Sequence, residues 1–279
     1  MVAATGVNGA IREMTMAEKI PLSVAIITKD EEANLPGCLK SVAFARQIVV
    51  IDSGSADGTL EIARDFGCDV FTEPWKGFGP QKQMAIDRCR EPWVLVLDAD
   101  ERIPPETEKA IRQVASGGEG GAPGYSFPRK NFFQGRWIRH MGWWPDRITR
   151  LFRNGRGRMT EAAVHEAVDV SGQVVSLDAP IEHYTESRLS EILKKIDRYS
   201  TLAAEEAFRE GRRSSVWGAI ARAELTFCQD YVLRLGFLDG RQGLVLSVTD
   251  AVNKFFKYAK LSELNRQAGA GEEREKVRG

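Results

Sequence analysis

The chain has 279 residues, a formal net charge of zero and a hydrophobic fraction of 43%. This length can bury a substantial core in one large domain, or in one domain with an appendage. No apolar run approaches the length of a transmembrane helix, which argues against a helical membrane span. The four cysteines, Cys38, Cys68, Cys89 and Cys228, show no C-x-x-C spacing. Buried thiols in a reducing cytoplasm are therefore favoured over zinc ligands or disulfides.

The first half of the chain alternates between predicted strands and helices. Residues 1–20 mix polar and small side chains without an apolar core, and we expect a disordered extension rather than a signal peptide. Short apolar runs then predict strands at residues 22–27, 47–51, 69–72 and 93–97. Helical patterns separate these runs, at residues 31–42, 60–66 and around 84–86. This alternation predicts parallel βαβ units with right-handed crossovers.

Three of these predicted strands end on small or acidic side chains. The segments that follow them are Thr28-Lys-Asp30, Asp52-Ser-Gly54 and Asp98-Ala-Asp100. In an open α/β sheet, ligands bind beyond the carboxyl ends of the strands. Two carboxylates at such an edge suit a Mg²⁺ ion held against a diphosphate. A solvated turn would explain a lone Asp-x-Asp equally well, but the surrounding α/β pattern favours a nucleotide site.

The same segments resemble the signatures of a known family. Residues 22–35 (LSVAIITKDEEANL), 49–59 (VVIDSGSADGT) and 96–104 (VLDADERIP) are similar to those of family-2 glycosyltransferases. Residues 142–146, 150–153, 164–166 and 236–241 extend the likeness to the bacterial lipopolysaccharide-core glucosyltransferase subfamily. The resemblance covers about Pro21 to Leu261. It implies a GT-A fold, a Rossmann-like nucleotide-sugar-binding domain, and inverting, metal-dependent transfer.

The resemblance also implies a set of site residues. Asp98 and Asp100 would bind Mg²⁺ or Mn²⁺. Lys82, near the start of a predicted helix, is expected to assist diphosphate binding, because helix N-termini favour anions. Ser53 stands where the family often has a second Asp, a departure that we interpret as a change of specificity. The expected nucleotide-sugar-binding residues are Thr28, Glu31, Asp52, Ser53, Asp57, Lys82 and Asp98.

Residues 125–160 contain nine Lys or Arg and one acidic residue, Asp146. Aromatic side chains are interleaved with these cations. A solvated face, a single-stranded nucleic-acid site and a phosphate-binding acceptor site are all compatible with this composition. The resemblance favours an acceptor site, with Arg136, Arg139, Arg150 and Arg153 as phosphate-binding residues and no nucleic-acid partner. A glycine-rich connector, residues 117–124, would separate a nucleotide half (21–116) from an acceptor half (124–187).

An inverting transfer requires a carboxylate base that removes a proton from the acceptor hydroxyl. Glu166 matches the place where family members carry a carboxylate after the acceptor-side strands. Asp146 is the second candidate, although a carboxylate among cations better suits a structural ion pair. His183 follows the last predicted strand, and some GT-A enzymes take a third metal ligand from a late histidine. A simple hydrogen bond is the more common role for such a histidine.

The last third of the chain predicts a helical appendage at residues 188–262, with helices at 191–209, 216–233 and 243–261. Its aromatic, apolar and basic side chains suit either an interfacial membrane helix or packing against protein. Residues 263–279 are rich in Gly, Glu, Lys and Arg, and we expect a disordered tail.

These patterns predict a hexosyltransferase that uses a nucleotide-sugar donor and an anionic, lipid-linked glycan acceptor of the lipopolysaccharide-core type. We expect it in the cytoplasm, peripherally at the inner-membrane surface. A sugar nucleotidyltransferase would want a glycine-rich loop with Arg and Lys after the first strand, where this chain has Thr28-Lys-Asp-Glu-Glu32. A nucleic-acid-binding module built on residues 125–160 is the other alternative.

Overall fold

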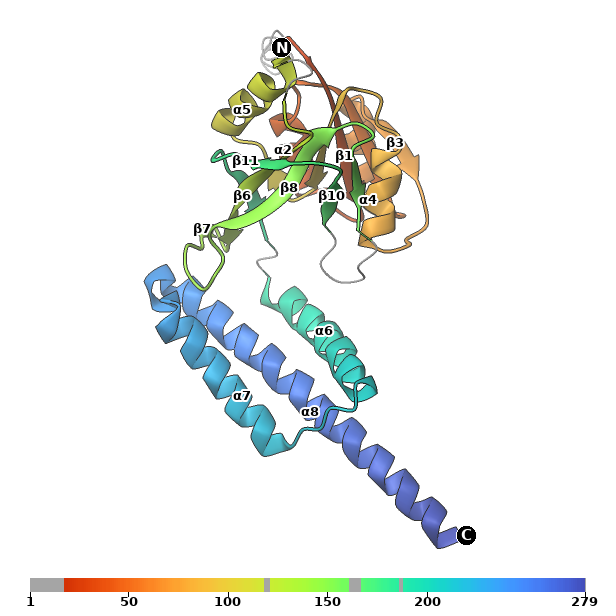
Figure 1. Cartoon of the computed structure of the whole chain (residues 1–279), viewed down its shortest axis with the longest axis vertical. Coiled ribbons are helices and arrows are strands. Elements are labelled where there is room, and N and C mark those ends of the chain that lie inside the picture. Colours follow the sequence, from red (N-terminus) through yellow and green to blue (C-terminus); the bar gives the residue numbers. More distant parts are fainter. Residues whose placement is uncertain (1–17, 118–120, 161–166, 186–187, 279) are drawn as a thin grey trace, which may run out of the picture. The chain divides into compact units, whose positions relative to one another are not determined.

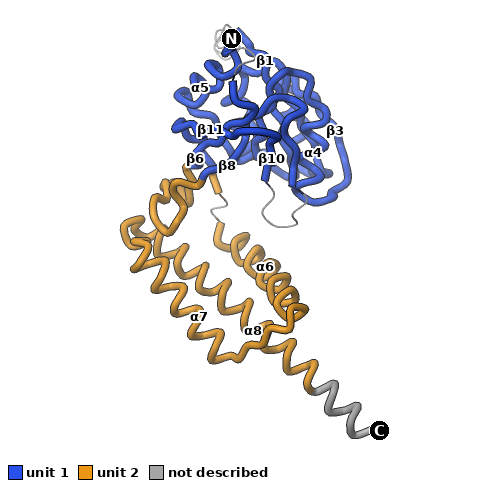
Figure 2. Tube along the Cα trace, in the orientation of Figure 1, with its two compact units in different colours: residues 1–129, 147–183 blue, residues 130–146, 184–279 orange. Residues whose placement is uncertain are grey.

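The computed structural model describes residues 18–117, 121–160, 167–185 and 188–278. The chain forms two compact units (Figure 2). Unit 1 comprises residues 1–129 and 147–183, and unit 2 comprises residues 130–146 and 184–279. The predicted acceptor half, residues 124–187, is thus shared between the two units, with residues 130–146 grouped with the C-terminal helices.

Unit 1 is built on a mixed β-sheet with helices (Figure 1). The strands that lie wholly or partly in unit 1 are β1 (Ile20–Thr28), β2 (Ala45–Asp52), β3 (Asp69–Thr72), β4 (Trp93–Asp98), β5 (Glu101–Arg102), β6 (Gly124–Phe133), β8 (Asp146–Arg153), β9 (Gly157–Met159), β10 (Val168–Val170), β11 (Val174–Ser176) and β12 (Ile181–Tyr184). Its helices are α2 (Leu35–Ser41), α3 (Thr59–Asp65), α4 (Phe78–Ile86) and α5 (Pro105–Ser116). The main sheet has the order β3-β2-β1-β4-β8-β6-β12-β5, with β11 and β7 (Arg136–Trp137) paired to β6. The strands β9 and β10 form a separate pair.

The strands β1, β2 and β4 run parallel, as the sequence predicts. Thr28 pairs with Asp52, and Ile27 pairs with Asp98, so the carboxyl ends of the three strands lie side by side. The strand β8 then pairs with β4 in the antiparallel sense. The sheet therefore confirms the predicted α/β architecture and brings the expected polar ends to one edge.

Apolar side chains on the central strands fill two separate cores. Along β1, Val24 and Ile26 belong to one core, whereas Ala25 and Ile27 belong to the other. This alternation follows from the two-residue period of a strand, whose side chains point to opposite faces. The central strands are buried on both faces, which fixes their register and hence the position of the polar residues at their ends.

Unit 2 is mainly helical. It contains β7, α6 (Leu189–Arg209), α7 (Val216–Cys228), the π-helical turn η2 (Gln229–Leu233), the 3₁₀ turn η3 (Gly236–Asp239) and α8 (Gly240–Arg278). Ser215 caps α7, because its side-chain oxygen accepts a hydrogen bond from the Gly218 N–H at 3.1 Å. The helix α8 packs against both α6 and α7. Its extent corrects the predicted disordered tail, since residues 263–278 continue the helix.

Two further predictions concern the N-terminal extension and the lack of a membrane-spanning helix. The expected N-terminal extension falls almost entirely on residues 1–17, outside the described residues, and β1 already begins at Ile20. Among the helices of the described chain, none is both long and apolar enough to cross a bilayer.

Candidate active site

A cluster of charges lies at the carboxyl end of β4, in which only the Asp98 side chain is partly exposed, at 27%. Asp98 accepts a hydrogen bond from Lys82 Nζ of α4 at 2.8 Å and one from Arg150 Nη2 of β8 at 2.7 Å, on different carboxylate oxygens. Lys82 and Arg150 are only 5% and 7% exposed. Three elements that are distant in sequence thus bring Asp98, Lys82 and Arg150 together, as expected for parts of one site.

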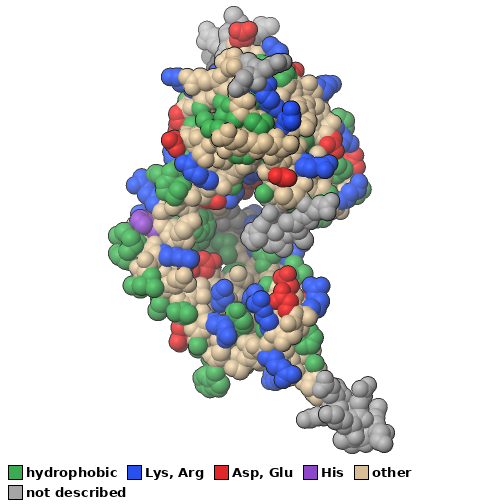
Figure 3. Space-filling view, in the orientation of Figure 1, with side chains coloured by type: hydrophobic (Ala, Val, Ile, Leu, Met, Phe, Trp, Pro, Cys, Tyr) green, Lys and Arg blue, Asp and Glu red, His purple; other side chains and the backbone are tan. Residues whose placement is uncertain are grey.

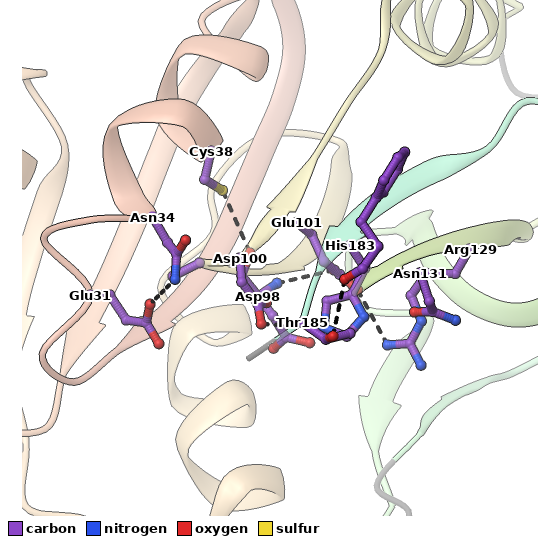
Figure 4. A network of polar contacts seen from close by, with 12 residues as sticks. Glu31, Asn34, Cys38, Asp98, Asp100, Glu101, Arg129, Asn131, His183 and Thr185 are labelled. Carbon is purple, nitrogen blue, oxygen red and sulfur yellow. Dashed lines mark hydrogen bonds and ion pairs between the residues drawn. The ribbon is translucent and has the colours of Figure 1, made fainter. Parts of the chain in front are cut away.

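Glu101 completes this cluster, although sequence reasoning assigned it no role. It is fully buried, and its Oε1 accepts a hydrogen bond from Arg150 Nη2 at 2.7 Å, with Arg129 Nη1 at 3.5 Å (Figure 4). Its other oxygen accepts the Asp98 N–H at 3.1 Å. The signal was present in the third signature, where Glu101 follows Asp98 by three residues. Its burial could not be foreseen, because it depends on the pairing of β5 with β12.

The cluster fixes the charge of its members. Burial alone would raise the pKa of Asp98, but the charges of Arg150 and Lys82 hold that pKa well below its ordinary value. Burial alone would lower the pKa of Arg150, yet the Glu101 and Asp98 carboxylates raise it above its ordinary value. Asp98 is therefore anionic and Arg150 cationic throughout the physiological pH range.

Asp100 lies beside this cluster with a different partner. His183 Nε2 of β12 is 3.2 Å from Asp100 Oδ2, and both side chains remain partly exposed (Figure 4). A carboxylate and an imidazole at this distance can both ligate a divalent cation. Among the described residues, no group of three or more His, Cys, Asp or Glu side chains could hold a metal. However, Mg²⁺ needs only one or two protein carboxylates when substrate phosphates supply other ligands.

The two carboxylates of the Asp-x-Asp motif therefore fit a metal unequally. Each oxygen of Asp98 already accepts a hydrogen bond from a cation, Lys82 or Arg150. Asp100 and His183 present a carboxylate oxygen and a ring nitrogen that are close enough to share one ion. The donor set fits a divalent cation at Asp100, whereas the geometry assigns Asp98 to holding the two cations.

At the edge formed by the ends of β1 and β2, some of the expected site residues are buried. Asp52 is fully buried, and its oxygens accept hydrogen bonds from Thr28 Oγ1 at 3.1 Å, Gly54 N–H at 2.8 Å and Ser55 N–H at 2.9 Å. Thr28 is only 4% exposed. These contacts fix the loop after β2, in which Gly54 adopts a φ of 89°. The expected contact of Thr28 and Asp52 with the nucleotide stays a prediction.

The other expected donor-binding residues on this edge are half-buried. Ser53 Oγ accepts a hydrogen bond from Gln81 Nε2 of α4 at 3.0 Å. Glu31 donates its N–H to Thr59 Oγ1 at 2.8 Å. Asp57 accepts the Thr59 N–H at 3.0 Å, at the start of α3. These contacts join the loops after β1 and β2 beside the charged cluster. The roles of Ser53, Glu31 and Asp57 in donor binding stay predictions.

Arg153 lies away from the charged cluster. It pairs with Trp93, the first residue of β4, and its guanidinium lies 4.6 Å from the centre of the Trp93 ring. Asp98 ends the same strand five residues later, about 17 Å away at the usual rise per residue. The antiparallel direction of β8 therefore places Arg150 and Arg153 toward opposite ends of β4. The expected phosphate-binding role of Arg153 stays a prediction.

Arg136 and Arg139 line a cavity of about 530 Å³ in unit 2. Arg139 stacks on Trp137, with its guanidinium 4.2 Å from the ring centre, and Arg136 Nη2 donates to the Leu238 carbonyl at 3.1 Å. Asp239, 1% exposed, also lines the cavity and accepts the N–H groups of Arg139 and His140. Asp239 is a further residue that the sequence did not assign to a site, because it is 99 residues from His140 along the chain. We call this the cationic pocket; its remaining lining residues are Gln134, Gly135 and Gln242.

Of the two candidate bases, the structure describes only Asp146. Glu166 lies in residues 161–166, outside the described residues. Asp146 begins β8 and belongs to unit 2, where Asn131 Nδ2 donates to its Oδ2 at 3.4 Å. The assignment of the base therefore stays a prediction.

Comparison with known proteins identifies the class. The family model of glycosyl transferase family 2 matches residues 23–168. The lipopolysaccharide core biosynthesis glycosyltransferase LpsC of Rhizobium meliloti (strain 1021) is 31% identical over 88% of this chain and 93% of its own. An uncharacterized glycosyltransferase, RT0209 of Rickettsia typhi, is 28% identical over 88% and 87% of the two chains. Among solved structures, residues 1–349 of S. aureus TarS in complex with UDP-GlcNAc give a TM-score of 0.46 at 15% identity, covering 88% of this chain and 92% of that one.

The chain belongs to glycosyl transferase family 2. This confirms the resemblance carried by the three signatures and the predicted GT-A fold class with a helical appendage. Membership of this family favours glycosyl transfer over both the sugar nucleotidyltransferase and the nucleic-acid-binding alternatives.

Proposed function

We propose that this glycosyltransferase moves a hexose, with inversion, from a nucleotide-sugar donor to an anionic, lipid-linked glycan of the cell envelope. The observation that carries the proposal is the charged cluster at the end of β4, where Asp98 holds Lys82 and Arg150 beside Asp100 and His183. The printed name of the Rhizobium relative supports a glycan of the lipopolysaccharide-core type. We place the reaction in the cytoplasm, at the inner-membrane surface.

The chain's own residues would perform three tasks at this site. Ser53, Glu31 and Asp57 would bind the donor nucleotide at the edge formed by β1 and β2. Lys82 and Arg150, fixed by Asp98, would stabilise the negative charge that develops on the departing nucleoside diphosphate. Such preorganised charges favour the transition state because they need no reorganisation during the reaction.

Asp100 and His183 would hold a divalent cation, Mg²⁺ or Mn²⁺. When bound, this ion would supply further charge neutralisation for the leaving diphosphate. A carboxylate, Glu166 or Asp146, would remove the proton from the attacking acceptor hydroxyl. Because the acceptor attacks the anomeric carbon directly in a single displacement, the configuration at that carbon inverts.

The cationic pocket of unit 2 would bind an anionic group of the acceptor. The guanidinium groups of Arg136 and Arg139 can each form paired hydrogen bonds with a phosphate or carboxylate. Replacing both by Gln should raise the acceptor KM by about tenfold, as expected for two exposed charge pairs of up to ~1 kcal/mol each. The donor KM should stay unchanged. An unchanged acceptor KM would remove the pocket from the proposal.

The direct test is a screen of nucleotide-sugar hydrolysis with Mg²⁺, Mn²⁺ and a chelator. We expect one donor to be hydrolysed, only with added cation. Product analysis with that donor and a lipopolysaccharide-core acceptor should then show inversion at the anomeric carbon. Retention of configuration, or full activity in the chelator, would contradict the proposed mechanism.

A further inference from the structure

The outer side of α7 and the turns that follow it expose many large apolar side chains. Trp217 is 80% exposed, Leu225 66% and Leu233 74%. Trp217, Ala221, Leu225, Cys228 and Val232 recur at spacings of three or four residues, so they share one side of the helical stretch. Figure 3 shows hydrophobic side chains gathered with Lys and Arg along the left edge of the unit that contains α7. Soluble proteins rarely expose a contiguous apolar surface of this kind unless it binds something.

The turns η2 and η3 extend this surface beyond the end of α7. Five apolar side chains are exposed within seven consecutive residues: Val232, Leu233, Leu235, Phe237 and Leu238. We call the exposed apolar residues of α7, η2 and η3 together the apolar face.

Buried contacts anchor the backbone of η3, whose apolar side chains are exposed. Gly236 is buried, and a Cβ there would lie 2.7 Å from the Asp230 carbonyl oxygen. Asp239, also buried, accepts the His140 N–H at 2.9 Å. The turn therefore cannot simply fold its apolar side chains inward.

The charges around the apolar face have one dominant sign. Asp230 and Asp239 are buried, and Asp230 pairs with Arg234 at 3.0 Å. Glu224 is the exposed acidic residue between residues 212 and 241. The exposed cations in the same stretch are Arg212, which pairs with Glu210 at 2.8 Å, Arg213, Arg222, Arg234 and Arg241. An apolar surface bordered by cations complements a bilayer with anionic headgroups, where each basic residue near the surface adds attraction.

The apolar face also adjoins the cationic pocket. Leu238, exposed in η3, lines that pocket together with Arg136 and Arg139. The same turn thus carries apolar groups suited to acyl chains and borders arginines suited to phosphate. This juxtaposition favours a lipid surface over an apolar protein partner, which would leave the pocket's charges without a counterpart.

We propose that the apolar face is a peripheral membrane-binding surface that docks on a bilayer of anionic phospholipid. The helix α7 would lie in the headgroup region, with Trp217, Leu225 and Leu233 in the interface. The inference deepens the proposed function, on which the choice of a membrane rests, by naming the surface that would meet a lipid-linked acceptor.

The test uses the full chain and vesicles of phosphatidylglycerol and phosphatidylcholine in a sedimentation assay. The double variant Leu233→Glu with Phe237→Glu places two carboxylates on the apolar face. The matched control is Leu193→Glu, on an exposed apolar position of α6 among mixed charges. A third variant, Arg213→Gln with Arg241→Gln, removes two cations and keeps the apolar side chains. Thermal unfolding monitored by circular dichroism verifies that each variant folds.

We expect the chain to bind anionic vesicles and to bind pure phosphatidylcholine much less. The two carboxylates should weaken binding by at least tenfold, whereas Leu193→Glu should leave it unchanged. Loss of the two arginines should weaken binding to anionic vesicles by about fivefold for each charge. The absence of vesicle binding by the wild-type chain would overturn the inference. A concentration-dependent dimer that Leu233→Glu with Phe237→Glu dissolves would also overturn it, by assigning the face to a second copy.

Donor hydrolysis separates failure of this inference from failure of the proposed function. The Leu233→Glu with Phe237→Glu variant should hydrolyse the donor in solution at the wild-type rate, since neither residue lies at the charged cluster. If the wild type transfers sugar yet ignores vesicles, the membrane surface is wrong and the catalytic proposal stands. If the wild type binds vesicles but uses no nucleotide sugar, the proposed function fails and the membrane-binding inference stands.

Discussion

The two units treat their apolar and charged side chains in opposite ways. In unit 1, apolar residues fill two cores around a sheet, and Arg150 is buried between two carboxylates. In unit 2, the cores are small, and most of the large hydrophobic side chains that are exposed in the described chain belong to it. Its Arg136 and Arg139 are exposed. Unit 1 therefore holds its charges in paired, largely buried contacts, whereas unit 2 exposes both apolar and basic side chains, as the proposed partner-binding surfaces require.

The largest expected effect comes from Asp100 and His183, the partly exposed pair beside the charged cluster of unit 1. Asp100→Ala should reduce sugar transfer by at least about a thousandfold, because a cation at a leaving group supplies several kcal/mol. His183→Ala should reduce it less, since the carboxylate remains. Steady-state transfer rates over a range of Mn²⁺ concentrations measure both. Circular dichroism should show an unchanged fold, and wild-type rates for Asp100→Ala would contradict the assignment.

The second prediction separates the two candidate bases. Glu166→Gln should lower kcat by about two to four orders of magnitude, the usual contribution of a positioned proton acceptor, with donor affinity little changed. Asp146→Asn, the matched control, should instead weaken acceptor binding or stability. Single-turnover transfer with saturating donor distinguishes these effects. The reverse pattern would move the base to Asp146.

The third prediction tests the contrast between Arg150, which is paired with two carboxylates, and Arg153 at the other end of the same strand. Arg150→Met leaves Asp98 and Glu101 without their shared cation, and should lower the free energy of unfolding by about 3–5 kcal/mol. Arg153→Met, at the other end of β8, should cost only about 1 kcal/mol, the scale of its cation–π contact with Trp93. Urea denaturation measures both values. Equal losses would show that the cluster is not a special feature of unit 1.

The smallest effect concerns the thiols, which are buried or half-buried in unit 1 and exposed in unit 2. Burial raises the pKa of Cys68 and of Cys89 to about 12, and raises that of Cys38 above its ordinary range. At pH 8, about one Cys68 thiol in ten thousand is then a reactive thiolate. Cys228 of α7 is exposed. Ellman's reagent should therefore modify one thiol quickly in the native protein, and Cys228→Ser should abolish that phase. Several fast thiols in unit 1 would contradict its tight packing.

Sequence reasoning succeeded where a single local pattern decides the outcome. Continuous apolar runs and the residues at their ends predicted the parallel strands and the edge on which Asp98 and Asp100 lie. It failed where partners come from distant strands. The direction of β8 separates Arg153 from Arg150, and the pairing of β5 with β12 buries Glu101. The composition of residues 125–160 favoured one acceptor site, whereas the fold places Arg150 in the charged cluster, Arg136 and Arg139 in the cationic pocket, and Arg153 at the other end of β8.

The C-terminal helices also show a limit of prediction from sequence. Its helices were predictable from apolar periodicity, but their extent was not. Residues 263–278 have a charged, glycine-containing composition that is typical of disorder, yet they continue α8, whose earlier turns pack against α6 and α7. A helix that tertiary packing has already nucleated can propagate into residues that would not start one.

In the proposed mechanism, Asp100 and His183 hold the cation that accompanies the donor diphosphate. Electron paramagnetic resonance of Mn²⁺ tests it without relying on turnover. With the nucleoside diphosphate of the identified donor, the wild-type chain should remove one equivalent of Mn²⁺ from the free six-line signal. Asp100→Ala should restore that signal, and Arg153→Met should not. If Asp100→Ala binds Mn²⁺ and the nucleotide as the wild type does, the account of this site is wrong.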